Sequence, residues 1–431
     1  MKTVWALCYN IVVLPLTYLL FRFGGLFSDK IKRAIQGRKG LFQRLQEEII
    51  RLPENKTRIW FHTASYGEFE QAKPVLSALK ENDQQVSIIV SLFSPSAYEN
   101  IAKFPAVDII TYLPFDSYWN AEKYISLIDP KVAVIVRHDI WPNHLWRAKK
   151  EGIPVILFDA TLRPDSSRFY PIVRNFSKTI YNTFDDILAA SHKDLERLKK
   201  LYSKHDHLQA VGDTKYDQAM KRSQEVEKLE AVIDLDAFDG KRVLVAGQTH
   251  LSDERHIIPA FKKLSAQIDN LIMILAPHEP TSENITSCEA ALDALKLSYL
   301  RLSQYRKHQT NVDFQILIVD SMGVLANLYR FAEVVFMGGS FRPGIHNVLE
   351  PSVYGVPILF GPKIQVSTEA QELVTRKGAF IVHNADEIYE KLYAYFTNET
   401  ERKQVGHITY ELVMENIGAT RKVVECIEKY L

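Results

Sequence analysis

Short runs of apolar, often β-branched residues alternate along the chain with longer stretches in which apolar residues recur every three to four positions. The runs predict strands, and the stretches predict helices that cover them. In the first half, the expected strands are residues 58–62, 86–91, 108–113, 132–136, 154–158 and 186–190. In the second half, they are residues 242–247, 271–276, 315–320, 333–339, 357–361 and 379–382. This alternation is typical of parallel sheets with helices on both faces.

A charged stretch at residues 220–242 interrupts the alternation, which then starts again. A chain of 431 residues is also too long for one ordinary core. We therefore expect an α/β protein with two doubly wound, Rossmann-like domains, at residues 28–220 and 221–431. Because ligands of such folds bind at the carboxyl ends of parallel strands, the two domains are expected to face a central cleft.

Residues 4–21 contain no charged side chain, and this length is the lower limit for a membrane-spanning helix. We expect residues 1–27 to form a retained membrane anchor. Asn10 and Pro15 leave open whether the helix spans the bilayer or enters one leaflet. A cleaved signal peptide fits less well, because Lys2 is the only charge before the apolar run and no small-residue cleavage site follows it. A buried core helix is the remaining alternative.

The residues after the apolar run are strongly basic. Residues 28–44 carry six cations against Asp29, namely Lys30, Lys32, Arg33, Arg38, Lys39 and Arg44. By the positive-inside rule this side stays in the cytoplasm, and the cations are expected to contact anionic membrane lipids. The whole chain has a globular composition, with 46% hydrophobic residues, 24% charged residues and a net charge of +1, and this balance predicts no nucleic-acid partner.

Polar residues and glycines follow the first predicted strand, at the end where ligands bind. Ser65, Gly67 and Glu68 lie where the next helix is expected to begin. Glu68 is either a first-turn charge that the helix dipole stabilises or a general base that removes a proton from an acceptor hydroxyl. Asp139 and Lys215 also lie near strand ends of the first half. Lys215 can pair with an acidic ligand group, although an exposed lysine is the commoner explanation.

Three successive strands of the second half also end in polar or glycine-containing turns. These turns contain Gly247, Gln248, Thr249, His250, His278, Asp320 and Gly323. Small and hydroxyl residues in front of a helix form sites for phosphate or sugar oxygens. The turn at 247–250 is neither a Walker A sequence nor a GxGxxG motif, so the type of nucleotide stays open.

The turn after the strand at 333–339 is the richest in such residues. It contains Gly339, Ser340, His346, Asn347 and Glu350. Glycine and serine let backbone N–H groups approach an anion, and a helix is expected to begin near His346 and Asn347, with Asn347 as its cap. We expect phosphate at this helix start and ribose hydroxyls at Glu350. A capped helix with an ordinary first-turn glutamate explains the same pattern without a ligand.

Several motifs occur together and in order: HTASYGE, WPN, GDTKYD, AGQTH followed by Glu254, and GGS, HNVLEP and GVPILFGP. In this combination and spacing the sequence resembles the bacterial 3-deoxy-D-manno-octulosonic acid (Kdo) transferases of lipopolysaccharide biosynthesis. The resemblance covers nearly the whole chain, including the apolar N-terminus. No single motif is specific enough to carry it.

The resemblance implies an inverting glycosyltransferase of the B type, placed at the bacterial inner (cytoplasmic) membrane with its catalytic domains on the cytoplasmic side. Its N-terminal domain takes the lipid A precursor, its C-terminal domain holds CMP-Kdo, and it needs neither a cofactor nor a metal at the reaction centre. Glu68 falls on the catalytic base of the family, and Lys215 falls on a lysine near the reaction centre. Gly339, Ser340, His346 and Asn347 fall on the donor phosphate site, and Glu350 falls on the ribose site.

The chain departs from the family pattern at several positions. Many members have an acidic-x-acidic pair before WPN, where this chain has Arg137, His138 and Asp139. Many also have Pro-Arg-His-Pro where this chain has PHEP, so an arginine expected near the donor is missing. Arg342 or His278 is a candidate to supply that positive charge. The alternatives are another B-type glycosyltransferase with a different nucleotide-sugar donor, or a non-catalytic membrane-bound sugar-binding protein.

Overall fold

The computed structural model describes residues 2–101, 103–228, 233, 238–308, 314–342 and 344–431. The chain forms two compact units. Unit 1 comprises Met1–Gln218 and Asn416–Leu431, and unit 2 comprises Ala219–Glu415. Part of the charged stretch at 220–242, which the sequence marked as the domain boundary, lies outside the described residues.

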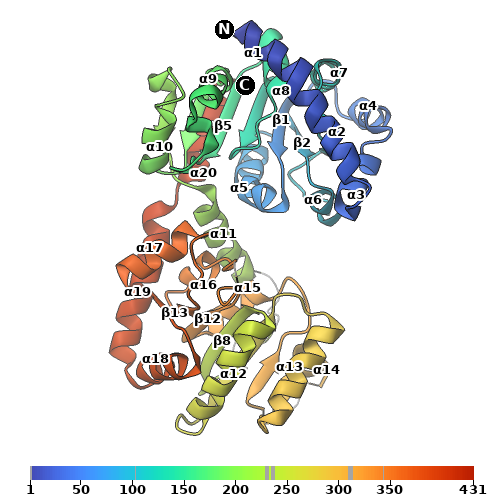
Figure 1. Ribbon diagram of the computed structural model, residues 1–431. Coiled ribbons are helices and arrows are strands. Elements are labelled where there is room, and N and C mark those ends of the chain that lie inside the picture. Colours follow the sequence, from blue (N-terminus) through green and yellow to red (C-terminus); the bar gives the residue numbers. More distant parts are fainter. Residues whose placement is uncertain (1, 102, 229–232, 234–237, 309–313, 343) are drawn as a thin grey trace. The chain divides into compact units, whose positions relative to one another are not determined.

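Unit 1 is built on a parallel sheet of seven strands in the order β3-β2-β1-β4-β5-β6-β7 (Figure 1). The strands are β1 (Thr57–Thr63), β2 (Val86–Leu92), β3 (Ile109–Tyr112), β4 (Val132–Val136), β5 (Val155–Ala160), β6 (Asp186–Ala189) and β7 (Leu208–Ala210). Neighbouring residues of β1 belong to two different core clusters, Trp60 to one and Ile59 and Phe61 to the other. Both faces of the sheet are therefore covered, which explains the nearly continuous apolar runs in the sequence.

Helices connect these strands. They are α3 (Asp29–Gly37), α4 (Leu41–Ile50), α5 (Tyr66–Asn82), α6 (Pro95–Asn100), α7 (Tyr118–Ile128), α8 (Pro142–Lys150), α9 (Pro171–Tyr181), α10 (His192–Leu198) and α11 (Thr214–Lys228), with short 3₁₀ turns η2 (Ser167–Phe169) and η3 (His205–His207). Helix α5 begins where Ser65 accepts a hydrogen bond from the Glu68 N–H, a regular serine N-cap. This cap fixes the position of Glu68 immediately after β1.

Unit 2 repeats the architecture, with the parallel strand order β10-β11-β9-β8-β12-β13-β14. Its strands are β8 (Arg242–Thr249), β9 (Leu271–Pro277), β10 (Tyr299–Arg301), β11 (Ile316–Ile318), β12 (Val334–Met337), β13 (Ile358–Phe360) and β14 (Ala379–Ile381). Its helices are α12 (Leu251–Ser265), α13 (Ser282–Ala294), α14 (Leu302–His308), α15 (Leu325–Leu328), η4 (Tyr329–Phe331), α16 (Leu349–Ser352), α17 (Thr368–Arg376), α18 (Ala385–Thr397) and α19 (Glu399–Asn416). The predicted α/β class with two parallel sheets is confirmed.

The last helix, α20 (Ala419–Glu428), belongs to unit 1. Val423, Val424 and Ile427 are buried in the same core cluster as Ile59 and Phe61 of β1. The Asp217 carboxylate accepts hydrogen bonds from the backbone N–H groups at the start of α20. The sequence-based second domain, which ran to residue 431, therefore differs from unit 2 at its end.

The apolar N-terminus forms a nearly continuous helix made of α1 (Lys2–Cys8), a π-helical turn η1 (Tyr9–Val13) and α2 (Leu14–Gly24). One side of it packs on unit 1 through polar contacts. The Tyr9 hydroxyl donates to Asp116 Oδ2 over 2.8 Å, and the Asn10 amide exchanges hydrogen bonds of 3.0 Å with Asn143. The alternative of a helix buried in the core does not fit, because only 6% of its apolar window is buried.

The other side of this helix is exposed and apolar. Its exposed side chains are Val4, Leu7, Ile11, Val12, Val13, Leu16, Leu19, Leu20 and Phe23. Residues Thr3–Gly24 are long and apolar enough to cross a membrane. Contacts along one side and apolar exposure along the other are typical of a helix that lies in a membrane surface.

Arg38 corrects one part of the prediction for the basic segment. Its guanidinium donates to the carbonyl oxygens of Leu113, Ala34 and Phe93 over 2.8–2.9 Å. It also lies over the rings of Phe93 and Phe115. Burial lowers the pKa of Arg38 to about 10. The Arg38 guanidinium therefore links α3 to the residues that follow β2 and β3, and it does not face lipid.

Candidate functional site

The carboxyl edge of the unit 1 sheet holds Glu68. Its side chain is 7% exposed, and its Oε2 accepts a hydrogen bond of 2.5 Å from the Ala64 N–H. Burial raises the pKa of Glu68, the hydrogen bond from Ala64 lowers it, and nearby Asp139 raises it. The net pKa lies above that of an ordinary glutamate. A buried carboxylate with a raised pKa at a strand end has the chemistry of a general base.

Asp139 is held by two neighbours at the same edge. His62 Nε2 lies 3.0 Å from Asp139 Oδ2, and the Trp141 indole N–H donates to the same oxygen over 2.9 Å. Burial alone would raise the pKa of Asp139, but the hydrogen bonds from His62 and Trp141 outweigh burial and lower it. The other ring nitrogen of His62 contacts Ser91. Asp139 is thus a fixed anion that sets the position of His62 beside Glu68.

Lys215 lies at the start of α11, and its Nζ is 3.1 Å from Asp213 Oδ2. Asp213 also accepts from the Gln71 amide over 3.1 Å, and Gln71 belongs to the helix that carries Glu68. The Thr214 N–H donates to Asp159 over 3.0 Å, and the Thr214 hydroxyl donates to the Gln71 carbonyl over 2.8 Å. These contacts link the loop of Lys215 to α5.

Asp159 is part of this network and was not among the residues predicted from the sequence. It is fully buried at the end of β5, and both burial and the neighbouring Asp213 raise its pKa. Asp159 and Arg137 adopt the left-handed backbone conformation, with φ of 49° and 63°. Such strain in non-glycine residues is concentrated at functional sites. Arg137 stands where the resemblance implied the first acidic residue before the WPN motif. Its charge lowers the pKa of Glu68.

Ser65 and Gly67 have different local roles. The Ser65 hydroxyl accepts the capping bond of α5. A Cβ at Gly67 would meet no atom within 4 Å, so packing within the described chain does not require glycine there. An open surface beside Glu68 is consistent with a ligand approaching this turn.

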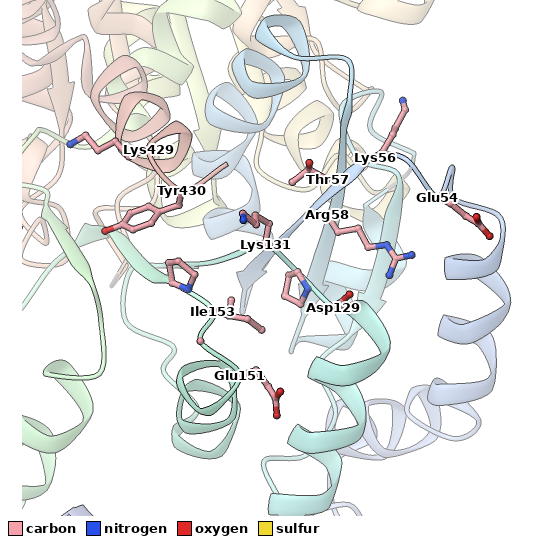
Figure 2. A pocket seen from close by; sticks show the side chains of 13 residues that line it. Glu54, Lys56, Thr57, Arg58, Asp129, Lys131, Glu151, Ile153, Lys429 and Tyr430 are labelled. Atoms are coloured by element: carbon pink, nitrogen blue, oxygen red, sulfur yellow. The ribbon is translucent and has the colours of Figure 1, made fainter.

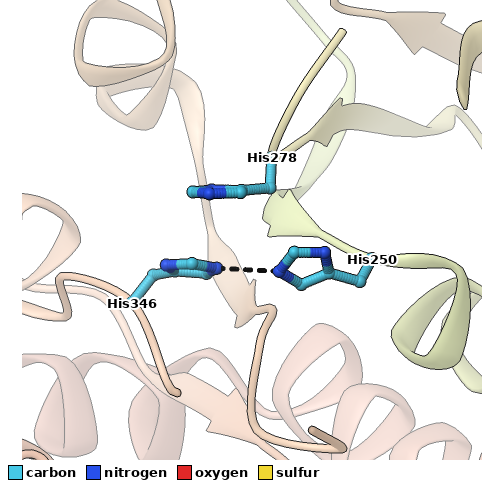
Figure 3. A group of neighbouring side chains, drawn as sticks. All are labelled: His250, His278 and His346. Carbon is cyan, nitrogen blue, oxygen red and sulfur yellow. Dashed lines mark hydrogen bonds between the residues drawn. The ribbon is translucent and has the colours of Figure 1, made fainter. Parts of the chain in front are cut away.

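In unit 2, three predicted residues from three different loops come together: His250, His278 and His346 (Figure 3). The Nε2 atoms of His250 and His346 are 3.2 Å apart, and the rings of His278 and His346 stack with centroids 4.1 Å apart. Burial, followed by the charges of His278 and His250, lowers the pKa of His346 to about 4. Burial and His250 also lower the pKa of His278. The lowered pKa values favour neutral imidazoles at His278 and His346.

Asp253 organises the backbone around these histidines, and sequence reasoning missed it. It is completely buried in the first turn of α12. Its Oδ2 accepts from the N–H groups of His250 over 2.8 Å and Gly339 over 2.9 Å, and its Oδ1 accepts from the Phe341 N–H over 3.4 Å. The capping-box spacing from His250 to Asp253 was the signal in the sequence that could have found it.

The glycine turn after β12 is explained by packing within the protein. A Cβ at Gly338 would lie 2.3 Å from the Gln248 carbonyl oxygen, and Gly339 has a φ of 91°. The Gly339 N–H is bonded to Asp253, and the Ser340 hydroxyl accepts from the Gly361 N–H over 2.5 Å. The Gly339 N–H is thus engaged by Asp253, and the Ser340 hydroxyl holds the Gly361 backbone. Close approach of two backbones explains the glycine at position 338.

The predicted helix start at His346 and Asn347 is wrong. Helix α16 begins at Leu349 and contains only Leu349–Ser352, so it brings little dipole to an anion. Asn347 still accepts a hydrogen bond of 3.1 Å from the Leu349 N–H. Glu350 is nearly buried, and the Arg222 guanidinium lies 2.5 Å from its Oε1. A ribose at Glu350 would share this carboxylate with Arg222.

The remaining predicted donor residues are placed as follows. Gly247 packs against the Tyr329 hydroxyl, where a Cβ would lie 2.3 Å away, and Gln248 has a left-handed φ of 54°. Thr249 donates to Glu254 over 2.9 Å. Asp320 accepts from the Ser303 N–H over 3.1 Å, and Gly323 is left-handed. Gly247, Gln248 and Thr249 thus adjoin the histidines, whereas Asp320 serves a contact with another loop.

A pocket of ≈ 740 Å³ lies in unit 1, lined mainly by charged and polar residues (Figure 2). Lys56 and Arg58 line it at the start of β1, and Lys131 lines it just before β4. It is therefore at the amino ends of the strands, opposite the edge that carries Glu68. Ligands of doubly wound sheets bind at the carboxyl ends, so this pocket is not the candidate active site.

Comparison with known proteins shows which sequences this chain is similar to. Residues 39–218 match the family model of 3-deoxy-D-manno-octulosonic-acid transferase (kdotransferase). The 3-deoxy-D-manno-octulosonic acid transferase of Haemophilus influenzae is 26% identical over 99% of both chains. The chain is thus similar to Kdo transferases over nearly its whole length. Another 3-deoxy-D-manno-octulosonic acid transferase, from Aquifex aeolicus, is 27% identical over 78% of this chain and 85% of its own length.

Solved structures support the two-sheet fold of this chain. UDP-GlcNAc 2-epimerase from Neisseria meningitidis aligns with a TM-score of 0.59 at 15% identity, over 86% of this chain and 100% of its own. A glycosyltransferase from Rickettsia africae aligns with a TM-score of 0.53 at 12% identity, over 87% of this chain and 99% of its own. At such identities the likeness concerns the two-sheet fold and not the reaction.

Proposed function

We propose that this protein is an inverting glycosyltransferase that moves Kdo from CMP-Kdo to the lipid A precursor during lipopolysaccharide biosynthesis. The observation that carries the proposal is Glu68, a buried carboxylate of raised pKa at the carboxyl edge of the unit 1 sheet. Its surroundings are those of a base, and the similarity to Kdo transferases suggests the substrates. The histidines, Asp253 and the turn at Gly338 and Gly339 form the proposed donor side.

In the proposed mechanism, Glu68 removes the proton from an acceptor hydroxyl, and the oxygen attacks the anomeric carbon of Kdo. The bond from that carbon to the phosphate oxygen breaks, and CMP leaves with the electron pair. A buried carboxylate is a stronger base than an exposed one, and Asp139 keeps the proton affinity of Glu68 high. Lys215 is the proposed partner for the Kdo carboxylate, which would compete with Asp213 for the ammonium group.

The proposed location is the inner (cytoplasmic) membrane, with both units on the cytoplasmic side. The exposed apolar side of α1–α2 supports membrane attachment, and its opposite side already packs on unit 1. We infer that the helix lies in one leaflet. The exposed cations Lys30, Lys32 and Lys39 are the proposed contacts with anionic headgroups, and Arg38 is not among them.

Glutamate at Leu19 and Leu20 is expected to weaken binding to phosphatidylethanolamine–phosphatidylglycerol vesicles by at least about 10-fold, because both side chains face outward and charged groups are costly in a bilayer. Vesicle flotation measures the loss. Met414→Glu, an exposed position on α19, is the control and should bind vesicles like the wild type. Unchanged binding by the Leu19 and Leu20 variant would contradict an apolar membrane face.

The activity itself is tested by incubating the purified protein with CMP-Kdo and a lipid A precursor, followed by mass spectrometry. We expect the acceptor mass to increase by one or more Kdo units, and the same spectrum counts them. Thermal stabilisation by CMP but not by UMP or UDP is the expected companion result. Stabilisation by uridine nucleotides without Kdo transfer would instead favour a different nucleotide-sugar donor.

A further inference from the structure

The three histidines of unit 2 are arranged like a set of metal ligands. One ring nitrogen from each of His250, His278 and His346 lies within 4.8 Å of the others, and within the described part of the chain this is the one such group of His, Cys, Asp or Glu side chains. Two nitrogens bound to one tetrahedral zinc ion, each about 2.1 Å from it, lie roughly 3.4 Å apart. The distance of 3.2 Å between the Nε2 atoms of His250 and His346 matches this value.

We propose that His250, His278 and His346 bind one divalent transition metal ion, with a fourth coordination position open to a ligand. Figure 3 shows the three rings converging, with His278 stacked against His346. To bind the ion, His278 turns its ring out of this stack, which a rotation of its side chain achieves. Three imidazoles without a carboxylate select zinc, cobalt, nickel or copper over magnesium and calcium.

The backbone that carries these rings is already fixed. The His250 N–H is bonded to Asp253, and the His278 N–H donates to the Thr249 carbonyl over 2.8 Å. A Cβ at Gly339 would lie 2.8 Å from the His346 ring, so the glycine gives this ring its space. Ligands on a fixed backbone bind metal well, because little order is gained on binding.

The surroundings of the His278 ring are a second argument for metal binding. It has no hydrogen-bond partner of its own among the described residues, and its contacts are with the two other imidazoles. Each neutral imidazole offers one lone pair and one N–H. Half-buried rings that stack face to face leave some of these groups without a hydrogen-bond partner. A shared cation uses all three lone pairs at once.

The role of the ion rests on the proposed function. An ion held by the three histidines brings positive charge to the proposed donor side, and its open position accepts an oxygen of the donor phosphate. The ion is thus a donor-binding group, and the reaction centre at Glu68 keeps its metal-free chemistry.

The site is tested by titrating metal-stripped, full-length protein, with any polyhistidine tag removed, with Co²⁺ and Zn²⁺. We expect one equivalent of Co²⁺ to give the visible absorption of a tetrahedral complex, and Zn²⁺ to displace it. His278→Arg, which adds a positive charge but removes a ligand, should weaken binding by at least about 100-fold, because loss of outer-shell partners alone costs 10–100-fold. His346→Gln is the second variant, and circular dichroism checks that each one folds.

His383→Gln is the matched control, because this exposed histidine contacts Glu387 outside the cluster and its loss should leave the titration unchanged. Equal Co²⁺ binding by wild type, His278→Arg and His346→Gln would overturn the site. No substrate is present in this titration, so its result is independent of Kdo transfer. A metal-dependent gain in CMP affinity, seen in wild type but not in His278→Arg, supports the donor role, and equal affinity with and without metal rejects that role.

Discussion

Glu68→Gln is expected to lower the rate of Kdo transfer by roughly 10²–10⁴-fold, the usual contribution of a general base. The amide oxygen of glutamine can still accept the hydrogen bond from the Ala64 N–H, so the turn after β1 should keep its shape. The loss should therefore appear in kcat, while CMP still stabilises the protein against heat. Mass spectrometry of initial rates with saturating CMP-Kdo measures it.

Glu70→Gln is the matched control for this experiment. Glu70 lies two residues further along α5 and pairs with Lys73, so its loss changes a helix-surface ion pair. Transfer by this variant should remain near the wild-type rate. Near wild-type transfer by Glu68→Gln would mean that another group takes the proton.

The pH profile gives an independent check on Glu68. Its pKa is raised, mainly by burial, so the carboxylate becomes protonated, and the base is lost, as the pH falls through a value above the ordinary glutamate range. In the wild type, kcat/KM should decrease on the acid side at that higher pH. In Glu68→Gln, the residual rate should lack this decrease.

Asp253→Ala is expected to destabilise unit 2 by about 2–4 kcal/mol, since it removes a buried charged acceptor from three backbone N–H groups. CMP binding should weaken with it, because the turns of His250 and Gly339 lose their common anchor. Hydrogen exchange of the peptides around these two residues measures the local loss. Tryptophan fluorescence serves as an internal reference, because all five tryptophans lie in unit 1.

Two further variants sharpen this test. Asp253→Asn keeps an oxygen acceptor without the charge, so its exchange rates should lie between those of wild type and Asp253→Ala. Asp269→Ala, an exposed position after α12, should change stability by no more than about 0.5 kcal/mol. Slow exchange around Gly339 in Asp253→Ala would show that the turn holds its shape without this carboxylate.

The strands were predictable because both faces of each sheet are covered, which produces long apolar runs. Twelve runs were predicted as strands, and each has a counterpart in the structure. The two strands that were missed, β7 (Leu208–Ala210) and β10 (Tyr299–Arg301), have three residues each. Gln209 is exposed and β10 is only partly buried, so neither strand carries the apolar signal.

The site was predictable residue by residue but not as a set of contacts. Loops at the carboxyl ends of parallel strands meet at one edge of a sheet. This rule predicted His250, His278 and His346 as residues of one site. It could not show that Asp253 joins two of those loops, nor that Asp159 accepts from the Thr214 N–H beside Lys215, because both contacts depend on partners far away in the sequence. Arg38 was misread for the same reason, since its carbonyl partners at Phe93 and Leu113 are remote.

Helix α20 gives unit 1 an unusual order of assembly. Unit 2 is one uninterrupted segment, so during synthesis all its strands leave the ribosome before residues 416–431 do. One core cluster of unit 1 stays incomplete until Val423, Val424 and Ile427 have been synthesised. The half of the protein that is translated first is thus completed last, and a nascent chain stalled after unit 2 would expose apolar surface to chaperones and proteases.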